Sequence, residues 1–236
     1  MDNLKRALAI LNIPADENTI DRFRGYMDDI LAWNEKVNLT TITEPTEFIV
    51  KHFIDSIITV EYDEFKNAGK IIDVGTGAGF PGVPLAIVSP DKEFVLMDSL
   101  KKRLNIIDEI CKKMEISNAC TVHARAEELA QNKDHREQYD LCVSRAVANL
   151  ATLSEYCLPF IRKGGFLLAY KGPEAEQEVK DAKKAIKILG GRVNEIRSSR
   201  LDEFDIHHNI VVIEKVADTP AKYPRKAGTP SKQPIR

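Results

Sequence analysis

The sequence predicts an α/β fold with a mostly parallel, doubly wound, Rossmann-like sheet and helices on both faces. Two observations predict it. From Lys70 onward, short apolar runs of strand length alternate with longer segments of helical character. A glycine-rich turn in "DVGTGAGFPG" follows the first of these runs, and backbone of this kind can approach a ligand closely. The 236 residues, 43% of them hydrophobic, suffice for one such sheet and an appendage.

Residues 1–65 are expected to form an N-terminal helical appendage. Five apolar side chains of the segment "DENTIDRFRGYMDDILAWNEKV" fall on one stripe at helical spacing: Ile20, Phe23, Met27, Ile30 and Leu31. The next segment, "TEPTEFIVKHFIDSIITV", has Pro45 near its start, which is typical of a first helical turn. The alternating strands and helices then occupy residues 66–216, and residues 217–236 form a basic, proline-rich arm.

The alternating part contains seven expected strands. They lie at 70–74, 93–98, 119–124, 139–146, 164–172, 191–199 and 207–216. Helices are expected from Pro81 onward and at 100–114, 125–130, 149–161 and 173–189. No helix separates the last two strands, so one of them is expected to run antiparallel at or near an edge of the sheet.

Composition bounds the partners and the compartment. The formal net charge of -2 gives no general argument for a nucleic-acid partner, so any such site must be a local patch. No apolar run approaches the roughly 18 residues of a membrane span, and the first residues do not resemble a signal peptide. The four cysteines show no CxxC spacing, so we expect reduced core thiols and no metal site. We therefore expect a cytoplasmic protein, monomeric by default.

The glycine-rich loop admits more than one interpretation. A P-loop requires a lysine after its last glycine, whereas Gly82 is followed by Val83 and Pro84. Gly77, Gly79 and Gly82 satisfy the GxGxxG spacing of dinucleotide sites. Gly75 adds a GxGxG frame that is common in methyltransferase loops. A tight turn without any ligand is the remaining interpretation.

Nearby acids favour a cofactor without phosphate. Asp98 ends the second strand, where a carboxylate can accept both hydroxyls of an adenosine ribose, although it could also cap the next helix. Glu127 follows the third strand, where the backbone can lie along an adenine edge. Asp73 is expected to face an ammonium group. Between residues 71 and 98 the only base is Lys92, so the loop lacks the cations that phosphates favour. These features favour S-adenosylmethionine over NAD.

Several blocks of the sequence together resemble one family. They are "WNEKVNLTTI", "HFIDSI", "DVGTGAGFPGVPLAI", "LMDSLKKR", "RAEE", "SRAVANL", "YKG", "NIVVIEK" and "KYPRKAGTPSKQPI". The chain resembles the bacterial 16S rRNA guanine-N7 methyltransferases, also called the glucose-inhibited division protein B family. The resemblance implies a seven-stranded class I methyltransferase sheet, with residues 66–216 binding S-adenosyl-L-methionine. It also implies methylation of N7 of one guanine, in the guanine 527 region of the decoding-site hairpin of 16S rRNA in the small ribosomal subunit.

The resemblance and the loop chemistry together nominate the cofactor-binding residues. They are Gly75, Gly77, Phe80, Asp98, Ala126, Glu127 and Arg145. Arg145 is also the expected catalytic residue, which would orient the substrate or the cofactor; the other interpretation is an ion pair with Glu155 or with the arm. The chain departs from the family at His208, where an arginine is usual.

A second group of residues is expected to contact RNA: Lys171, Arg197, Arg200, Lys222, Arg225 and Lys226. Truncation before Lys222 is accordingly expected to weaken RNA binding more than cofactor binding. Lys101, Lys102 and Arg103 are expected to form a solvated helix face instead.

The chemistry of N7 is consistent with the few acid–base residues in the sequence. Guanine N7 carries an in-plane lone pair and no proton, so its methylation needs alignment of the reactants rather than a general base. Two other functions remain open from sequence alone. One is an NAD-dependent oxidoreductase that uses the GxGxxG frame, and the other is a ribosome-assembly factor that binds RNA without turnover.

Overall fold

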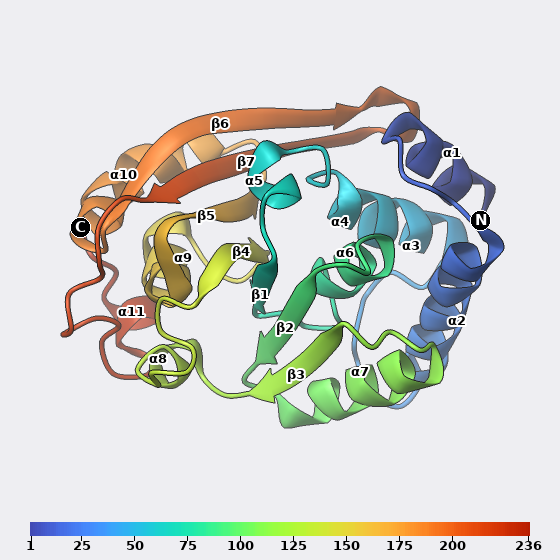
Figure 1. Cartoon of the computed structure of the whole chain (residues 1–236), viewed down its shortest axis with the longest axis horizontal. Helices are drawn as coiled ribbons and strands as arrows, with labels where there is room; N and C mark the ends of the chain where they lie inside the picture. The colour runs from blue at the N-terminus through green and yellow to red at the C-terminus, as the bar shows by residue number, and fades with distance from the viewer.

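The computed structural model describes the backbone of residues 1–236 and the side chains of all of them except Arg200. A single seven-stranded sheet has the order β3-β2-β1-β4-β5-β7-β6 (Figure 1). Its strands are β1 Lys70–Val74, β2 Glu93–Asp98, β3 Ala119–His123, β4 Tyr139–Arg145, β5 Ile161–Lys171, β6 Gly191–Leu201 and β7 Ile206–Lys215. The expected α/β fold is confirmed.

Strand direction also agrees with the sequence. Strands β1 to β5 are mutually parallel, whereas β7 runs antiparallel to both of its neighbours, β5 and β6. The chain order reverses at β1, which lies between β2 and β4. Open α/β sheets bind ligands beyond the carboxyl ends of their strands at such a reversal. The fold therefore places the functional site beyond Val74.

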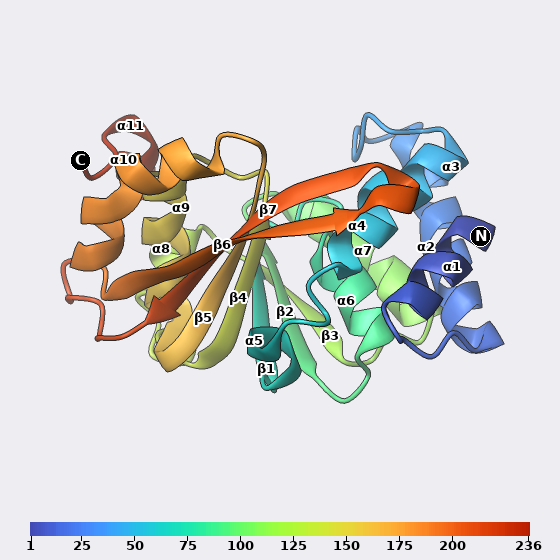
Figure 2. The same cartoon turned by 90° about the horizontal axis from the view of Figure 1, so that it is seen from above.

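Helices cover both faces of the sheet (Figure 2). On one face lie α6 Gly82–Val88 and α7 Lys101–Lys113, and on the other lie α8 Ala126–Leu129, α9 Leu150–Cys157 and α10 Ala175–Ile188. The alternation of strand side chains divides the interior accordingly. Ile71 belongs to the hydrophobic cluster beneath α6 and α7, and Ile72 belongs to the cluster beneath α9 and α10.

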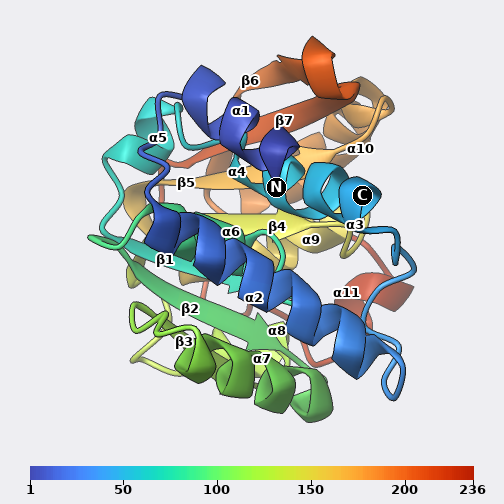
Figure 3. The ribbon, with the colours of Figure 1, turned by 90° about the vertical axis from the view of Figure 1, so that its right-hand side faces the viewer.

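The first 66 residues are mainly helical, as expected. They form α1 Asp2–Ile10, α2 Glu17–Asn34, α3 Pro45–Phe48, a π-helix Ile49–Ile54, α4 Asp55–Ile57 and α5 Asp63–Lys66. Helix α2 begins at an Asp16 cap and crosses the sheet on the side of α6 and α7 (Figure 3). Its fully buried Phe23 and Ile30 belong to the same cluster as Ile71. These helices therefore share one core with the sheet.

One boundary differs clearly from the expectation. Strand β5 begins at Ile161, three residues before the expected start at Gly164, because Ile161 pairs with Tyr139 ahead of an irregularity in which the extra residues lie in β5. The polar and glycine residues of "RKGG" do not resemble a strand, so the sequence did not predict this pairing.

After β7 the chain returns along α8 and α9 to the short helix α11 Thr229–Lys232 (Figure 1). Within the described part of the chain, no helix is both long enough and apolar enough to cross a membrane.

Candidate functional site

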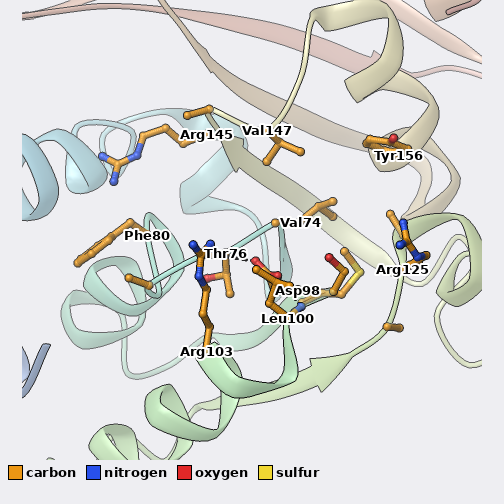
Figure 4. Close-up of a pocket in the computed structure, with 18 of the residues that line it drawn as sticks. Val74, Thr76, Phe80, Asp98, Leu100, Arg103, Arg125, Arg145, Val147 and Tyr156 are labelled. Atoms are coloured by element: carbon orange, nitrogen blue, oxygen red, sulfur yellow. Dashed lines mark hydrogen bonds between the residues drawn. The ribbon is translucent and has the colours of Figure 1, made fainter. Parts of the chain in front are cut away.

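A cavity of about 470 Å³ opens beyond the carboxyl ends of β1, β2 and β4. Its walls include the glycine loop, the end of β2, the start of α8 and the segment after β4. Phe80 and Arg145 lie at one end, and Arg125 and Tyr156 lie at the other, with Asp98 between them (Figure 4). The cavity is thus elongated, which suits a ligand with two chemically different ends.

The glycine loop takes backbone conformations that only glycine adopts easily. Gly75, Gly77 and Gly79 have φ values of +77°, +61° and +89°. The next turn is held by Asp73, whose Oδ2 accepts hydrogen bonds from Thr76 Oγ1 at 2.7 Å and from the backbone N–H of Gly82 at 2.9 Å. The loop therefore presents bare backbone to the cavity.

The expectation that Asp73 faces a ligand ammonium is wrong. Its side chain is fully buried, and the residue does not line the cavity. Burial raises the pKa of the Asp73 carboxyl to about 7, although the bonds from Thr76 and Gly82 act in the opposite direction. Asp73 shapes the loop from behind.

Asp98 joins the loop to the next helix. Its Oδ2 accepts a hydrogen bond from Gly77 N–H at 3.0 Å, and its Oδ1 accepts one from Leu100 N–H at 2.9 Å. Each carboxylate oxygen keeps a second lone pair for a further donor. Asp98 thus lines the cavity and holds the turn before α7. The cap residue of that helix is Leu100, and no side chain caps it, so the alternative of Asp98 as a helix cap is wrong, while its contact with a ribose stays a prediction.

The far end of the cavity is built by α8 and α9. Ala126 and Glu127, at the start of α8, line it together with Tyr156 of α9. The carboxylate of Glu127 accepts a hydrogen bond at 2.7 Å from the backbone N–H of Gly228, which belongs to the C-terminal arm. The sequence contains no local signal for this long-range contact.

Arg145 ends β4 and is turned toward the N-terminal helices. Its guanidinium lies 5.6 Å from the centre of the Phe80 ring, donates to the carbonyl of Lys51 at 3.1 Å and forms an ion pair with Asp55. His208 Nε2 lies 2.9 Å from the other carboxylate oxygen of Asp55. The partner of Arg145 is thus Asp55, and not Glu155 or the arm.

His52 packs against the two residues at this end of the cavity, Phe80 and Arg145. Its ring stacks on Phe80 at 4.4 Å with an interplanar angle of 2°, and its Nδ1 lies 3.3 Å from Arg145. The other ring nitrogen lies 2.7 Å from Thr40 Oγ1. Burial and the charge of Arg145 lower the pKa of His52 to about 4, so the ring is neutral at pH 7.

Asp55 remains ionised although it is buried. Burial acts to raise the pKa of its carboxyl, but the hydrogen bond from His208 and the charge of Arg145 hold that pKa below the ordinary value. The same hydrogen bond raises the pKa of His208. His52 lies in the π-helix and Asp55 begins α4, and both side chains reach Arg145.

The residues expected to contact RNA fall into different environments. Lys171 is buried, and its ammonium donates to Glu178 at 2.8 Å and to the carbonyl of Ala148 at 2.7 Å. Arg225 pairs with the buried Glu155 at 2.6 Å. Lys171 is thus engaged inside the protein, whereas Arg225 is partly exposed and engaged in an ion pair. Contact of either residue with RNA stays a prediction.

The other expected RNA contacts are more accessible. Arg197 is partly buried, pairs with Glu64 at 3.1 Å and lies 4.1 Å from the centre of the Tyr62 ring. Lys222 and Lys226 are exposed. The side chain of Arg200 lies outside the described part of the structure. Arg103, expected on a solvated helix face, instead lines the cavity.

Comparison with known proteins identifies relatives over the whole chain. The family described as "rRNA small subunit methyltransferase G" matches residues 19–207. The chain is 49% identical to the ribosomal RNA small subunit methyltransferase G of Clostridium novyi, with 100% of both chains covered. It is 50% identical to the protein of that name from Alkaliphilus oremlandii, with 100% of this chain and 98% of the relative covered.

Solved structures support the fold. An O-methyltransferase from Bacillus cereus, in complex with SAH, matches with a TM-score of 0.57 and 14% identity, over 90% of this chain and 96% of the other. TYW2 of M. jannaschii, in complex with AdoMet, matches with a TM-score of 0.52 and 15% identity, over 69% of this chain and 74% of the other. At these identities the likeness concerns the fold alone.

Proposed function

Because the chain belongs to the rRNA small subunit methyltransferase G family, we propose that it methylates N7 of a guanine in 16S rRNA, in the guanine 527 region, with S-adenosyl-L-methionine as methyl donor. The observation that carries the proposal is the elongated cavity in which the glycine loop and Asp98 meet beyond β1 and β2. The family relationship supports the RNA substrate, and the cavity supports the cofactor.

The residues of the cavity fit this cofactor. Asp98 has lone pairs that would accept the ribose hydroxyls, and Ala126 with Glu127 would meet the adenine, since all three residues line the cavity. The backbone of Gly75 and Gly77 would face the methionine portion, and Phe80 and Arg145 would close that end. The glycine loop itself carries no basic side chain, which suits a ligand without phosphates. When bound, the cofactor supplies an electrophilic methyl group on a sulfonium.

The protein's part in the reaction is alignment. Guanine N7 has no proton to remove, so no general base is required. Holding two reactants in line can supply roughly 7–11 kcal/mol of the barrier. The guanidinium of Arg145 contacts the carbonyl of Lys51, the carboxylate of Asp55 and the ring of His52. These three contacts fix its position in the wall of the cavity. We assign it the orientation of substrate or cofactor.

The mouth of the cavity suits an unstacked base. Leu100 and Val147 both line it and are 50% and 38% exposed, which is unusual for large apolar side chains on this protein. Enzymes that modify a base take it out of the stack and hold it between aromatic or apolar groups.

Arg103 and Arg125 line the same cavity and would supply positive charge for the RNA backbone. The exposed Lys222 and Lys226 of the arm, together with Arg197, would extend the RNA surface.

The direct test is methyl transfer from labelled S-adenosyl-L-methionine to small ribosomal subunits that lack N7 methylation, followed by nucleoside analysis. We expect label in 7-methylguanosine of 16S rRNA. Label in another nucleoside would contradict the N7 assignment while keeping the methyltransferase. Cofactor binding without any label would contradict turnover on this substrate and favour an RNA-binding assembly factor.

A further inference from the structure

The C-terminal arm is bound tightly to the wall of the cavity. Arg225 donates to the carboxylate of Glu155 from Nε at 2.9 Å, from Nη2 at 2.6 Å and from its backbone N–H at 2.8 Å. The side chain of Glu155 is 1% exposed, so this ion pair neutralises a buried carboxylate. Three residues further on, Gly228 donates its N–H to Glu127.

Weaker anchors hold the arm along its length. Arg136 donates to the carbonyl of Thr219 at 2.7 Å and to that of Tyr223 at 3.0 Å. Gln131 donates to the carbonyl of Pro224 at 3.1 Å. Gln131 and Arg136 lie in the segment between α8 and β4, and the acceptors Glu127 and Glu155 lie in α8 and α9. The arm is therefore attached to the elements that form the Tyr156 end of the cavity.

These contacts reach two residues of the cavity. Glu127 lines the cavity, is 6% exposed and receives its described hydrogen bond from the arm. Tyr156 also lines the cavity and directly follows Glu155, the residue that Arg225 holds. A buried carboxylate that loses its partner is costly and tends to move toward water. Release of the arm would thus displace both residues.

We propose that the C-terminal arm is a positioning element of the cofactor site, in which Arg225 and Gly228 hold Tyr156 and Glu127 in place for the adenine ring. The proposal rests on the function proposed above, since it requires adenine at this end of the cavity. It also changes an expectation from the sequence. Truncation before Lys222 would weaken cofactor binding directly and not only RNA binding.

The chemistry of Glu127 gives the arm a specific effect. With Oε1 occupied by Gly228, Oε2 is the oxygen left to accept a hydrogen bond from the exocyclic amine of adenine. Hypoxanthine carries a carbonyl in place of that amine and offers no donor there. A site that holds an acceptor in this position discriminates between the two bases because one of them leaves the acceptor unpaired. The arm therefore contributes to the choice of base.

The test compares two ligands, S-adenosylhomocysteine and S-inosylhomocysteine, by calorimetric titration of the full chain. We expect Arg225→Ala to weaken binding of the adenosyl compound by about tenfold, which corresponds to about 1.4 kcal/mol. Binding of the inosyl compound should weaken less, because it loses the placement of Tyr156 but has no amine hydrogen bond to lose. The ratio of the two affinities should therefore fall.

Two further variants keep the test decisive. Arg192→Ala removes an Arg–Glu pair of the same 2.6 Å length, between β6 and β7, and should leave the ratio unchanged. Gln131→Ala removes only the bond to Pro224, should fold even if Arg225→Ala does not, and should lower the ratio by a smaller factor. Equal losses for both ligands, or an unchanged ratio, would overturn the positioning role. Failure of the unaltered protein to bind either ligand would contradict the proposed function itself.

Discussion

Replacing Gly75 with valine is expected to weaken S-adenosyl-L-methionine binding by at least about 100-fold, or about 2.7 kcal/mol. Gly75 has a φ of +77°, a conformation that a β-branched residue avoids. A Cβ at this position would lie 2.5 Å from Cγ2 of Val147, so one wall of the cavity must shift. The new side chain would also occupy the backbone surface that faces the ligand. Calorimetric titration measures the affinity.

The matched control is Gly172→Val. A Cβ at Gly172 would meet nothing within 4 Å, and that glycine does not have a positive φ, so cofactor affinity should be retained. Thermal unfolding followed by circular dichroism should stay cooperative for both variants. Unchanged cofactor affinity in a folded Gly75→Val variant would refute the assignment of the glycine loop to the cofactor.

Arg145→Ala is expected to reduce methyl transfer by at least about 100-fold, because small misplacements of reactants cost rate on this scale. It should also destabilise the protein, since it removes the cation that pairs with the buried Asp55. Breaking a buried pair costs about 3–5 kcal/mol, and the loss here should lie at the lower end because His208 still faces Asp55. Single-turnover kinetics and chemical denaturation measure the two effects separately.

The double variant Arg145→Ala with Asp55→Ala separates folding from chemistry. Without the carboxylate no unpaired charge remains, so stability should recover in part, whereas methyl transfer should stay low. Arg162→Ala, which removes the exposed pair with Asp140, serves as the control for loss of an ion pair away from the cavity. Recovery of methyl transfer in the double variant would show that Arg145 acts only through folding.

Local patterns were sufficient to predict the fold. Strand-length apolar runs separated by helical segments predicted all seven strands, and the missing helix between the last two strands predicted that one of them runs antiparallel. The glycine loop and Asp98 also lie together as expected, because the carboxyl ends of neighbouring parallel strands meet at one edge of the sheet. These features depend on residues close in sequence or on a regular topology.

Partners of charged side chains could not be predicted in the same way. Arg145 and Asp55 are 90 residues apart, and Arg225 and Glu155 are 70 apart. Which acid meets which base depends on how the N-terminal helices and the arm pack on the sheet, and no periodicity encodes that. Lys171 and Arg225 therefore looked like free cations in the sequence, although both are engaged in ion pairs in the structure.

Methylation of N7 at one guanine of 16S rRNA can be tested position by position along the RNA. N7-methylguanosine makes RNA sensitive to reduction and amine-catalysed strand cleavage, so the modified position can be read directly along 16S rRNA. Small subunits that lack the modification would be treated with the protein and S-adenosyl-L-methionine, then cleaved and mapped by primer extension. We predict a single new stop in the decoding-site hairpin, at guanine 527. A stop elsewhere in the RNA, or no stop beyond that of untreated subunits, would contradict the claim.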